Sequence, residues 1–124
     1  MYRLGTIFRF EAEHKLPFEG GKESEKHSHE YKLEIIVSGN ELDENGFLVD
    51  IVALKRIARE TISHFEGRYL NDMEEMKGKV PSLENLAALI YQRAQVPMEK
   101  LGVKLDRIKL WEDDFSWTSY DGCE

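Results

Sequence analysis

The sequence predicts an α+β fold, in which one antiparallel sheet carries two helices on one face. Residues 2–14 and 27–38 alternate between apolar and polar side chains, and both segments come before any helical pattern. Two amphipathic segments follow, and two more strand-like segments complete the chain. Strands grouped before and after a helical pair are typical of the α+β class. Because 124 residues is an ordinary length for one domain, we expect residues 1–124 to form a single unit.

The two N-terminal strands are predicted from a period of two. Successive side chains of a strand point to opposite faces of the sheet, so alternation separates a buried face from a wet one. A polar loop of residues 15–26 joins the two segments and contains Pro17 and the pair Gly20-Gly21. Such a loop is long for a hairpin, and long loops beside a candidate site are often functional. The residues expected on the buried face are Phe8, Phe10, Ala12 and His14 in the first strand, and His27, His29, Tyr31, Leu33, Ile35 and Val37 in the second.

The first helix is predicted to begin after Asp50, a residue type that favours the N-cap position. The short apolar run Phe47-Leu48-Val49, just ahead of this cap, is compatible with a continued strand meander. Beyond the cap, apolar residues recur at steps of three and four, which is the spacing of one helix face. The face consists of Leu54, Ile57, Ala58, Thr61, Ile62 and Phe65.

A charged segment, residues 66–80, is expected to be a connection with little regular structure, since it contains two glycines. Ser82 predicts the N-cap of a second helix, and the acidic Glu84 in its first turn complements the helix dipole. Pro97 and Gly102 are expected to close this helix. Its buried stripe is Leu83, Leu86, Ala87, Ile90 and Ala94.

Two further strands are predicted over residues 103–112 and 115–120. Alternation in the first of them places Glu112 on the same face as the apolar residues. The opposite face of the sheet still carries large apolar side chains, among them Ile36 and Trp111. We therefore expect a partner subunit to cover that face.

Three histidines are expected to meet at one end of the sheet. His27 and His29 lie one residue apart on a strand, so both imidazoles point to the same side, roughly 6.5–7 Å apart at the backbone. If the first two strands pair, His14 reaches the same end of the same face. A single histidine of this kind is most often an ordinary strand-end residue. Three histidines on one face, with no cysteine nearby, favour a zinc site whose fourth position is left to water or substrate.

The composition excludes several classes of function. The net charge is −7 and the basic residues form no stripe, so binding of nucleic acid through its phosphates is not expected. No apolar run approaches the roughly 20 residues that a membrane helix needs, and the first residues do not form a signal peptide. One cysteine, Cys123, is present, so no disulfide framework is expected. We expect a cytoplasmic protein that spans no membrane.

Six ordered stretches of the chain resemble one known family. The chain is similar to the 6-pyruvoyl-tetrahydropterin synthase and 6-carboxy-tetrahydropterin synthase family, which has the tunnelling fold. The resemblance implies β-β-α-α-β-β subunits that join their sheets into an oligomeric barrel, as a homo-oligomeric trimer or hexamer (homohexamer). Ser28 stands where the family usually has Gly. The stretches that carry the resemblance are FEAEHKL, HSHEYKLEIIVSG, ENGFLVDIVALK, YLND, PSLENLA and LWEDDFSWTSY, in which a Glu is followed eight residues later by Tyr.

The resemblance implies roles for named residues. His14, His27 and His29 stand at the positions of the family's zinc ligands. Glu112 would anchor a pterin, because its carboxylate can accept two adjacent N–H groups of the ring in a bidentate pair. Ser82 would add a hydroxyl contact to the ring, serve only as a helix cap, or do both. Glu84 is better explained by the helix dipole than by ligand binding.

The chain departs from the family at its proton-transfer residues. The family has a Cys shortly before the two histidines, and here that position falls on Glu23. The family's Asp-His pair falls on Glu66-Gly67, and the nearest histidine is His64, about one helical turn earlier. A carboxylate can accept a proton if desolvation raises its pKa, so Glu23 is the candidate base, although it can equally be a solvated loop residue. Whether His64 replaces the missing histidine is left open.

The expected function is that of a zinc-dependent lyase acting on the side chain of 7,8-dihydroneopterin triphosphate. Some family members with Glu in place of the Cys are associated with cleavage of this side chain to 6-hydroxymethyl-dihydropterin, a folate precursor, in place of elimination of triphosphate. One alternative is a pterin- and zinc-binding homologue without turnover. Another is an enzyme like 6-carboxy-tetrahydropterin synthase, acting in 7-deazaguanine (queuosine) synthesis, although the missing Cys counts against it. For the triphosphate, the sequence offers Lys15, Lys22, Lys26 and Arg68 without choosing among them.

Overall fold

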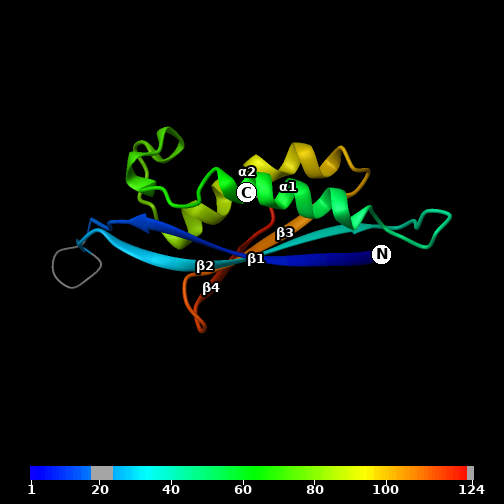
Figure 1. The fold of residues 1–124 in the computed structure, drawn as a ribbon, viewed down its shortest axis with the longest axis horizontal. Helices are drawn as coiled ribbons and strands as arrows, with labels where there is room; N and C mark the ends of the chain where they lie inside the picture. Colours follow the sequence, from blue (N-terminus) through cyan, green and yellow to red (C-terminus); the bar gives the residue numbers. More distant parts are fainter. Residues whose placement is uncertain (18–23, 123–124) are drawn as a thin grey trace.

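The structure is a computed structural model that describes residues 1–17 and 24–122. It consists of a four-stranded antiparallel sheet with two helices on one face. The strands lie in the order of the chain, and both helices cover the same side of the sheet (Figure 1). The α+β prediction is therefore confirmed. The elements are β1 (Tyr2–His14), β2 (His27–Gly39), α1 (Ile51–Ser63), α2 (Leu83–Glu99), β3 (Lys104–Trp111) and β4 (Trp117–Tyr120).

Strands β1 and β2 form a long paired arm. Their register runs without interruption from Tyr2 opposite Gly39 to His14 opposite His27. The core lies between this sheet and the helices, as predicted from the alternation. Within β1 and β2 the fully buried side chains include Phe10, Ala12, Tyr31, Leu33, Ile35 and Val37. Phe8 is only partly buried and packs against the edge of this core.

Helix α1 begins where the sequence predicts. The carboxylate of Asp50 accepts hydrogen bonds from the backbone N–H groups of Val52 and Ala53, at 3.0 and 3.4 Å. The helix ends at Ser63, so Phe65 lies beyond it, although its side chain is buried. A tighter turn closes the helix here, because the N–H of Phe65 donates to the carbonyl of Ile62.

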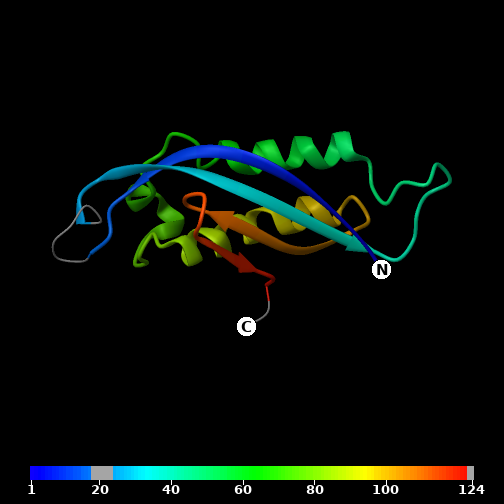
Figure 2. The ribbon, with the colours of Figure 1, turned by 90° about the horizontal axis from the view of Figure 1, so that it is seen from below.

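The connection between the helices is more ordered than expected. It contains two short 3-10 helices, η2 (Leu70–Asp72) and η3 (Glu74–Met76). Three apolar side chains anchor them in the core, namely Leu70, Met73 and Met76. The segment lies over the end of the sheet where β1 ends and β2 begins (Figure 1, Figure 2).

Two other local expectations are wrong. Residues 48–49 form a bend and Phe47 has no regular structure, so no strand forms here, and only Val49 of the three is buried. Pro97 lies inside α2, which continues to Glu99. The missing proline N–H weakens one turn, but Met98 is fully buried and the N–H of Lys100 donates to the carbonyl of Val96.

The sheet face away from the helices carries several apolar side chains. Ile7 and Trp117 are each 53% exposed, while Ile36 and Trp111 are half-buried. Two ammonium groups rest on the indole rings: Lys32 Nζ lies 4.1 Å from the centroid of Trp111, and Lys109 Nζ lies 4.1 Å from that of Trp117. Such a face fits the expectation that a partner covers it.

Candidate metal centre and its surroundings

Three imidazoles converge at one end of the sheet. The β1–β2 register sets His14 opposite His27 and His29 opposite Ala12, so alternation sends all three rings toward the helix side. The Nε2 atoms of His14 and His27 are 2.8 Å apart, and those of His27 and His29 are 3.1 Å apart. One ligand nitrogen from each ring lies within 4.8 Å of the other two. His14 is buried, whereas His27 and His29 are half-buried, so the cluster opens toward one side.

Backbone carbonyls orient two of the rings from behind. His14 Nδ1 lies 2.8 Å from the carbonyl oxygen of Pro81, and His27 Nδ1 lies 2.7 Å from that of Glu25. A carbonyl can only accept, so each Nδ1 carries the proton and donates it. In a neutral ring whose Nδ1 carries the proton, Nε2 has a lone pair and no proton. The Nε2 lone pairs of His14 and His27 therefore face each other across 2.8 Å with no proton between them. A cation is the natural partner for this arrangement, which is the usual way in which metal-binding histidines are held.

The donor set fits zinc. Tetrahedral zinc–nitrogen bonds of about 2.0–2.1 Å would put the Nε2 atoms about 3.3 Å apart, close to the observed spacings. Three imidazoles leave one position of the tetrahedron for water or substrate. Within residues 1–17 and 24–122, this is the group of histidine, cysteine and carboxylate side chains whose ligand atoms come close enough to share one ion.

The end of β1 beside the histidine cluster is held in place by the segment between the helices. Asn71 Oδ1 accepts from the N–H of Lys15, and Asn71 Nδ2 donates to its carbonyl, both at 2.9 Å. Two residues before Lys15 in the chain, Glu13 forms a parallel β-bridge with Tyr69. A segment remote in sequence thus fixes the residues on either side of His14.

The positions of the family's Asp-His pair have a structural role in this chain. The carboxylate of Glu66 accepts a hydrogen bond from the N–H of Glu11 at 2.9 Å. The N–H of Gly67 donates to the carbonyl of Glu11 at 2.7 Å. Together they extend the hydrogen bonding of the β1 edge.

His64 pairs with a carboxylate on a neighbouring element. Its Nε2 bonds to Glu75 in η3, and Arg93 lies 4.0 Å from the same carboxylate oxygen. The hydrogen bond from His64 is the main reason why the pKa of Glu75 is held below its ordinary value. No pattern in the sequence indicates this partner, because Glu75 lies 11 residues away in a segment expected to be irregular. The side chain of His64 thus pairs with Glu75. A catalytic role for His64 stays a prediction.

Ser82 and Glu84 lie at the start of α2, directly after the carbonyl that supports His14. Ser82 Oγ accepts from the N–H of Asn85 at 3.1 Å, which confirms the predicted N-cap. Glu84 is exposed in the first turn, where it complements the helix dipole. A contact of Ser82 with a pterin stays a prediction.

Glu112 lies one residue beyond the end of β3 and is half-buried. Because the strand ends at Trp111, alternation no longer determines which face Glu112 takes. It lines a polar cavity together with Arg9, Glu30 and Lys32, whose side chains lie on the face away from the helices. The neighbouring Asp113 is exposed. Two backbone N–H groups chiefly lower the pKa of Asp113, and the charge of His29 contributes.

Three residues singled out from the sequence lie outside the described part of the chain. Glu23, the candidate base, falls within residues 18–23, and Cys123 falls within residues 123–124. The same holds for Lys22.

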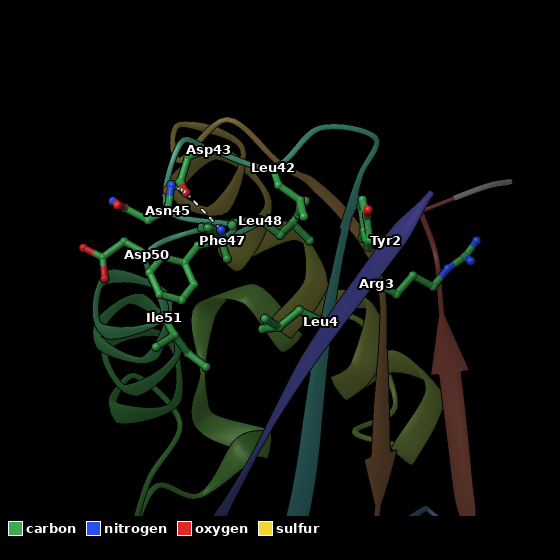
Figure 3. Close-up of a pocket in the computed structure, with 12 residues that line it drawn as sticks. Tyr2, Arg3, Leu4, Leu42, Asp43, Asn45, Phe47, Leu48, Asp50 and Ile51 are labelled. Carbon is green, nitrogen blue, oxygen red and sulfur yellow. Dashed lines mark hydrogen bonds between the residues drawn. The ribbon is translucent and has the colours of Figure 1, made fainter.

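A large cavity lies at the opposite end of the sheet. It has a volume of about 660 Å³ and is lined by the start of β1, the segment 42–49 and the start of α1 (Figure 3). Leu4, Leu42, Phe47 and Ile51 give it an apolar wall. It lies roughly 40 Å along β1 from His14, at the strand rise of about 3.3 Å per residue, so it belongs to a different region of the molecule. The histidine cluster is the candidate site, because three side chains that can bind one metal ion converge there.

Comparison with known proteins places these features in one family. Residues 3–123 match the description of the family "6-pyruvoyl tetrahydropterin synthase". The chain is 32% identical over 105 residues to the 6-carboxy-5,6,7,8-tetrahydropterin synthase of Bacillus subtilis, covering 81% of this chain and 70% of that protein. It is 29% identical over 104 residues to the 6-pyruvoyl tetrahydrobiopterin synthase of Dictyostelium discoideum, covering 82% and 75%.

Solved structures agree on the fold. The 6-pyruvoyl tetrahydropterin synthase of Caenorhabditis elegans superposes with a TM-score of 0.88 at 21% identity, covering 98% of this chain and 96% of that chain. A catalytic-residue mutant of the Plasmodium vivax enzyme, with a glutamate changed to alanine, superposes with a TM-score of 0.68 at 12% identity, covering 97% and 98%. Both share the tunnelling fold.

Within residues 1–17 and 24–122, no helix is long and apolar enough to cross a membrane. The chain belongs to the 6-pyruvoyl tetrahydropterin synthase family.

Proposed function

We propose that the protein is a zinc-dependent pterin lyase that acts on the side chain of 7,8-dihydroneopterin triphosphate. The observation that carries this proposal is the convergence of three Nε2 atoms, two of them oriented by backbone carbonyls, in a member of a pterin-enzyme family. Bound zinc would polarise the hydroxyl groups of the pterin side chain and lower their pKa. His14, His27 and His29 hold the ion, and the half-buried side of the cluster admits the substrate.

Glu112 binds the pterin ring in this proposal. Its carboxylate accepts two neighbouring N–H groups of the ring, which is a strong, geometrically specific pair. Ser82 is the second candidate for the ring, since it directly follows the Pro81 carbonyl that supports His14. The cap bond that Ser82 accepts leaves its hydroxyl hydrogen available for donation.

Glu23 transfers the proton. It stands at the spacing of the family's Cys before the two histidines, and a carboxylate in a desolvated site can act as a general base. The mutated Plasmodium vivax enzyme supports the chemistry, because a glutamate is the catalytic residue that was replaced in that protein. With this base we favour cleavage of the side chain to 6-hydroxymethyl-dihydropterin, a folate precursor, over loss of triphosphate.

Two other functions fit part of the site. A pterin- and zinc-binding protein without turnover is favoured by the pairing of His64 with Glu75 and by the structural role of Glu66 and Gly67. An activity like that of 6-carboxy-tetrahydropterin synthase is favoured by the Bacillus subtilis relative. The absence of the family's Cys from its usual position argues against this last function.

The protein is active as a cytoplasmic homo-oligomer, a trimer or hexamer. The half-exposed apolar side chains on the sheet face away from the helices support this, since a partner subunit would remove them from water. Sedimentation of the purified protein would measure the assembly size.

Turnover of dihydroneopterin triphosphate by the purified, zinc-loaded protein tests the proposal. Mass spectrometry of the products distinguishes 6-hydroxymethyl-dihydropterin from 6-pyruvoyl and 6-carboxy products. Glu23→Gln should abolish turnover, whereas Glu44→Gln, an exposed carboxylate near the other end of the sheet, should retain it. No pterin product from the wild-type protein, together with tight pterin binding, would leave only the binding function.

A further inference from the structure

We infer that the cavity between Lys15 and Lys79 is the subsite for the phosphate chain of the substrate. This inference rests on the proposed function, because it assumes a phosphorylated pterin side chain at the histidine cluster. It goes further by naming the residues that recognise the phosphates.

The cavity has the size and charge that a phosphate chain requires. Its volume is about 360 Å³, within the range of small-molecule sites. Four other cavities, at the far end of the sheet, beside α1, at the end of β3 and beside α2, each include at least one carboxylate. This cavity has two lysines and no carboxylate, in a chain whose net charge is −7. Its lining residues are Lys15, Leu16, Pro17, Asn71, Gly78, Lys79, Val80 and Pro81.

The cavity adjoins the candidate metal centre through two of its walls. Lys15 directly follows His14 in the chain. Pro81 lines the cavity, and its carbonyl oxygen lies 2.8 Å from His14 Nδ1. The cavity therefore lies on the Nδ1 side of His14, and a phosphate chain that reaches it passes around this ring from the half-buried side, where His27 and His29 lie.

Hydrogen bonds fix the backbone that carries both lysines. Asn71 holds the N–H and the carbonyl of Lys15 at 2.9 Å each. The N–H of Lys79 donates to the carbonyl of Met76, and Asn85 Nδ2 donates to the carbonyl of Val80 at 2.8 Å. The cavity wall is thus ordered before a ligand arrives, which reduces the entropy lost on binding.

The structure also separates these lysines from the other cations that the sequence offered. Lys26 Nζ lies 4.6 Å from the ring centroid of Tyr69 and 4.0 Å from a carboxylate oxygen of Glu13. Arg68 donates to the carbonyl of His64 at 3.2 Å. Lys15 and Lys79 are exposed, and the ion pairs found among residues 1–17 and 24–122 involve neither of them. Lysine is a compact, flexible cation that suits phosphate oxygens in several geometries.

Binding of inorganic tripolyphosphate to the zinc-loaded protein tests the subsite by isothermal calorimetry. Lys15→Gln and Lys79→Gln keep most of the side-chain length and remove the charge. Each should weaken tripolyphosphate binding by about fivefold, and the double variant by more than about twentyfold, because each lysine makes charge-assisted bonds in a partly exposed site. Lys77→Gln is the matched control, since it makes the same charge change in the same segment outside the cavity lining.

A second comparison separates the phosphate chain of a substrate from free polyphosphate. The wild-type protein should bind dihydroneopterin triphosphate more tightly than dihydroneopterin, and the double variant should lose most of this preference while its zinc content stays unchanged. Equal tripolyphosphate affinity in the wild type and the double variant would overturn the subsite, as would an equal loss in Lys77→Gln. Failure of the wild type to bind unphosphorylated dihydroneopterin would instead refute the proposed function, and the tripolyphosphate result would still decide the subsite.

Discussion

His14 Nδ1 lies 2.8 Å from the carbonyl oxygen of Pro81, a residue 67 positions further along the chain. This contact joins the end of β1 to the start of α2. It sets the tautomer of a candidate metal ligand, and the same proline lines the cavity assigned to phosphate. The support of a candidate metal ligand, the helix cap at Ser82 and the proposed phosphate subsite therefore share one short segment of backbone.

Loss of one imidazole should abolish metal binding. The wild-type protein should contain about one equivalent of zinc per chain, and His29→Ala should contain almost none, since two ligands hold zinc far more weakly than three. Metal analysis by mass spectrometry measures this. His64→Ala is the control and should keep its zinc, because His64 bonds to Glu75. Equal zinc in the wild type and His29→Ala would contradict the assignment.

Removal of the metal should lower the melting temperature. A ligand that binds only the folded state at about a hundred times its dissociation constant stabilises by roughly 2.7 kcal/mol. For a chain of this length that corresponds to roughly 10 °C. Calorimetry before and after dialysis against a chelator measures the shift, and zinc should restore it. The same chelator should leave the melting temperature of His29→Ala unchanged.

Asn71→Ala should destabilise the end of β1. The variant loses the two hydrogen bonds between the Asn71 side chain and the backbone of Lys15. At an exposed site this should reduce the free energy of unfolding by about 1–2 kcal/mol. Urea denaturation measures the change. Gln92→Ala, which removes an exposed amide side chain from α2, should change stability by less than about 0.5 kcal/mol.

The His64–Glu75 pair should make stability depend on acid pH. The folded state holds the pKa of Glu75 below its ordinary value, chiefly through the hydrogen bond with His64. The stabilisation is therefore present above the unfolded pKa of about 4.3, and it is lost as pH falls through the lower folded pKa. Since the Glu75 side chain is 35% exposed, the contribution should be about 0.5–1 kcal/mol.

Glu75→Gln tests this linkage by urea denaturation at a series of pH values. The wild type should be more stable than the variant near pH 5–6, and the difference should shrink below about pH 4. Glu74→Gln, an exposed neighbour in η3, should follow the wild-type profile. A difference between wild type and Glu75→Gln that stays constant down to the lowest pH would argue against the pair.

Glu112→Gln should weaken pterin binding without affecting the metal. The amide presents one acceptor where the carboxylate presents two, so the bidentate pair with the ring is lost. Affinity for dihydroneopterin should fall by about tenfold or more, which is the scale of one charge-assisted bond. Fluorescence titration measures the affinity, and zinc content should stay at the wild-type level. Unchanged affinity would place the ring elsewhere.

Much of the fold could be read from local patterns. The period of two in residues 2–14 and 27–38 is set by strand geometry, so it identified the buried faces and brought His14, His27 and His29 to one end. The caps at Asp50 and Ser82 are equally local, since each oxygen bonds to a backbone N–H two or three residues away.

The remaining features depend on where distant segments meet. The carbonyl of Pro81 behind His14, the Asn71 clamp on Lys15 and the His64–Glu75 pair join residues that no period or spacing relates. The burial of Leu70 and Met73 in a segment expected to be irregular has the same origin. The convergence of the three histidines of the candidate metal site thus follows from local strand geometry. The bonds that support this site, and the proposal that Lys15 and Lys79 bind phosphate, depend instead on the path of the folded chain, because a hydrogen bond forms only where folding brings a donor to an acceptor.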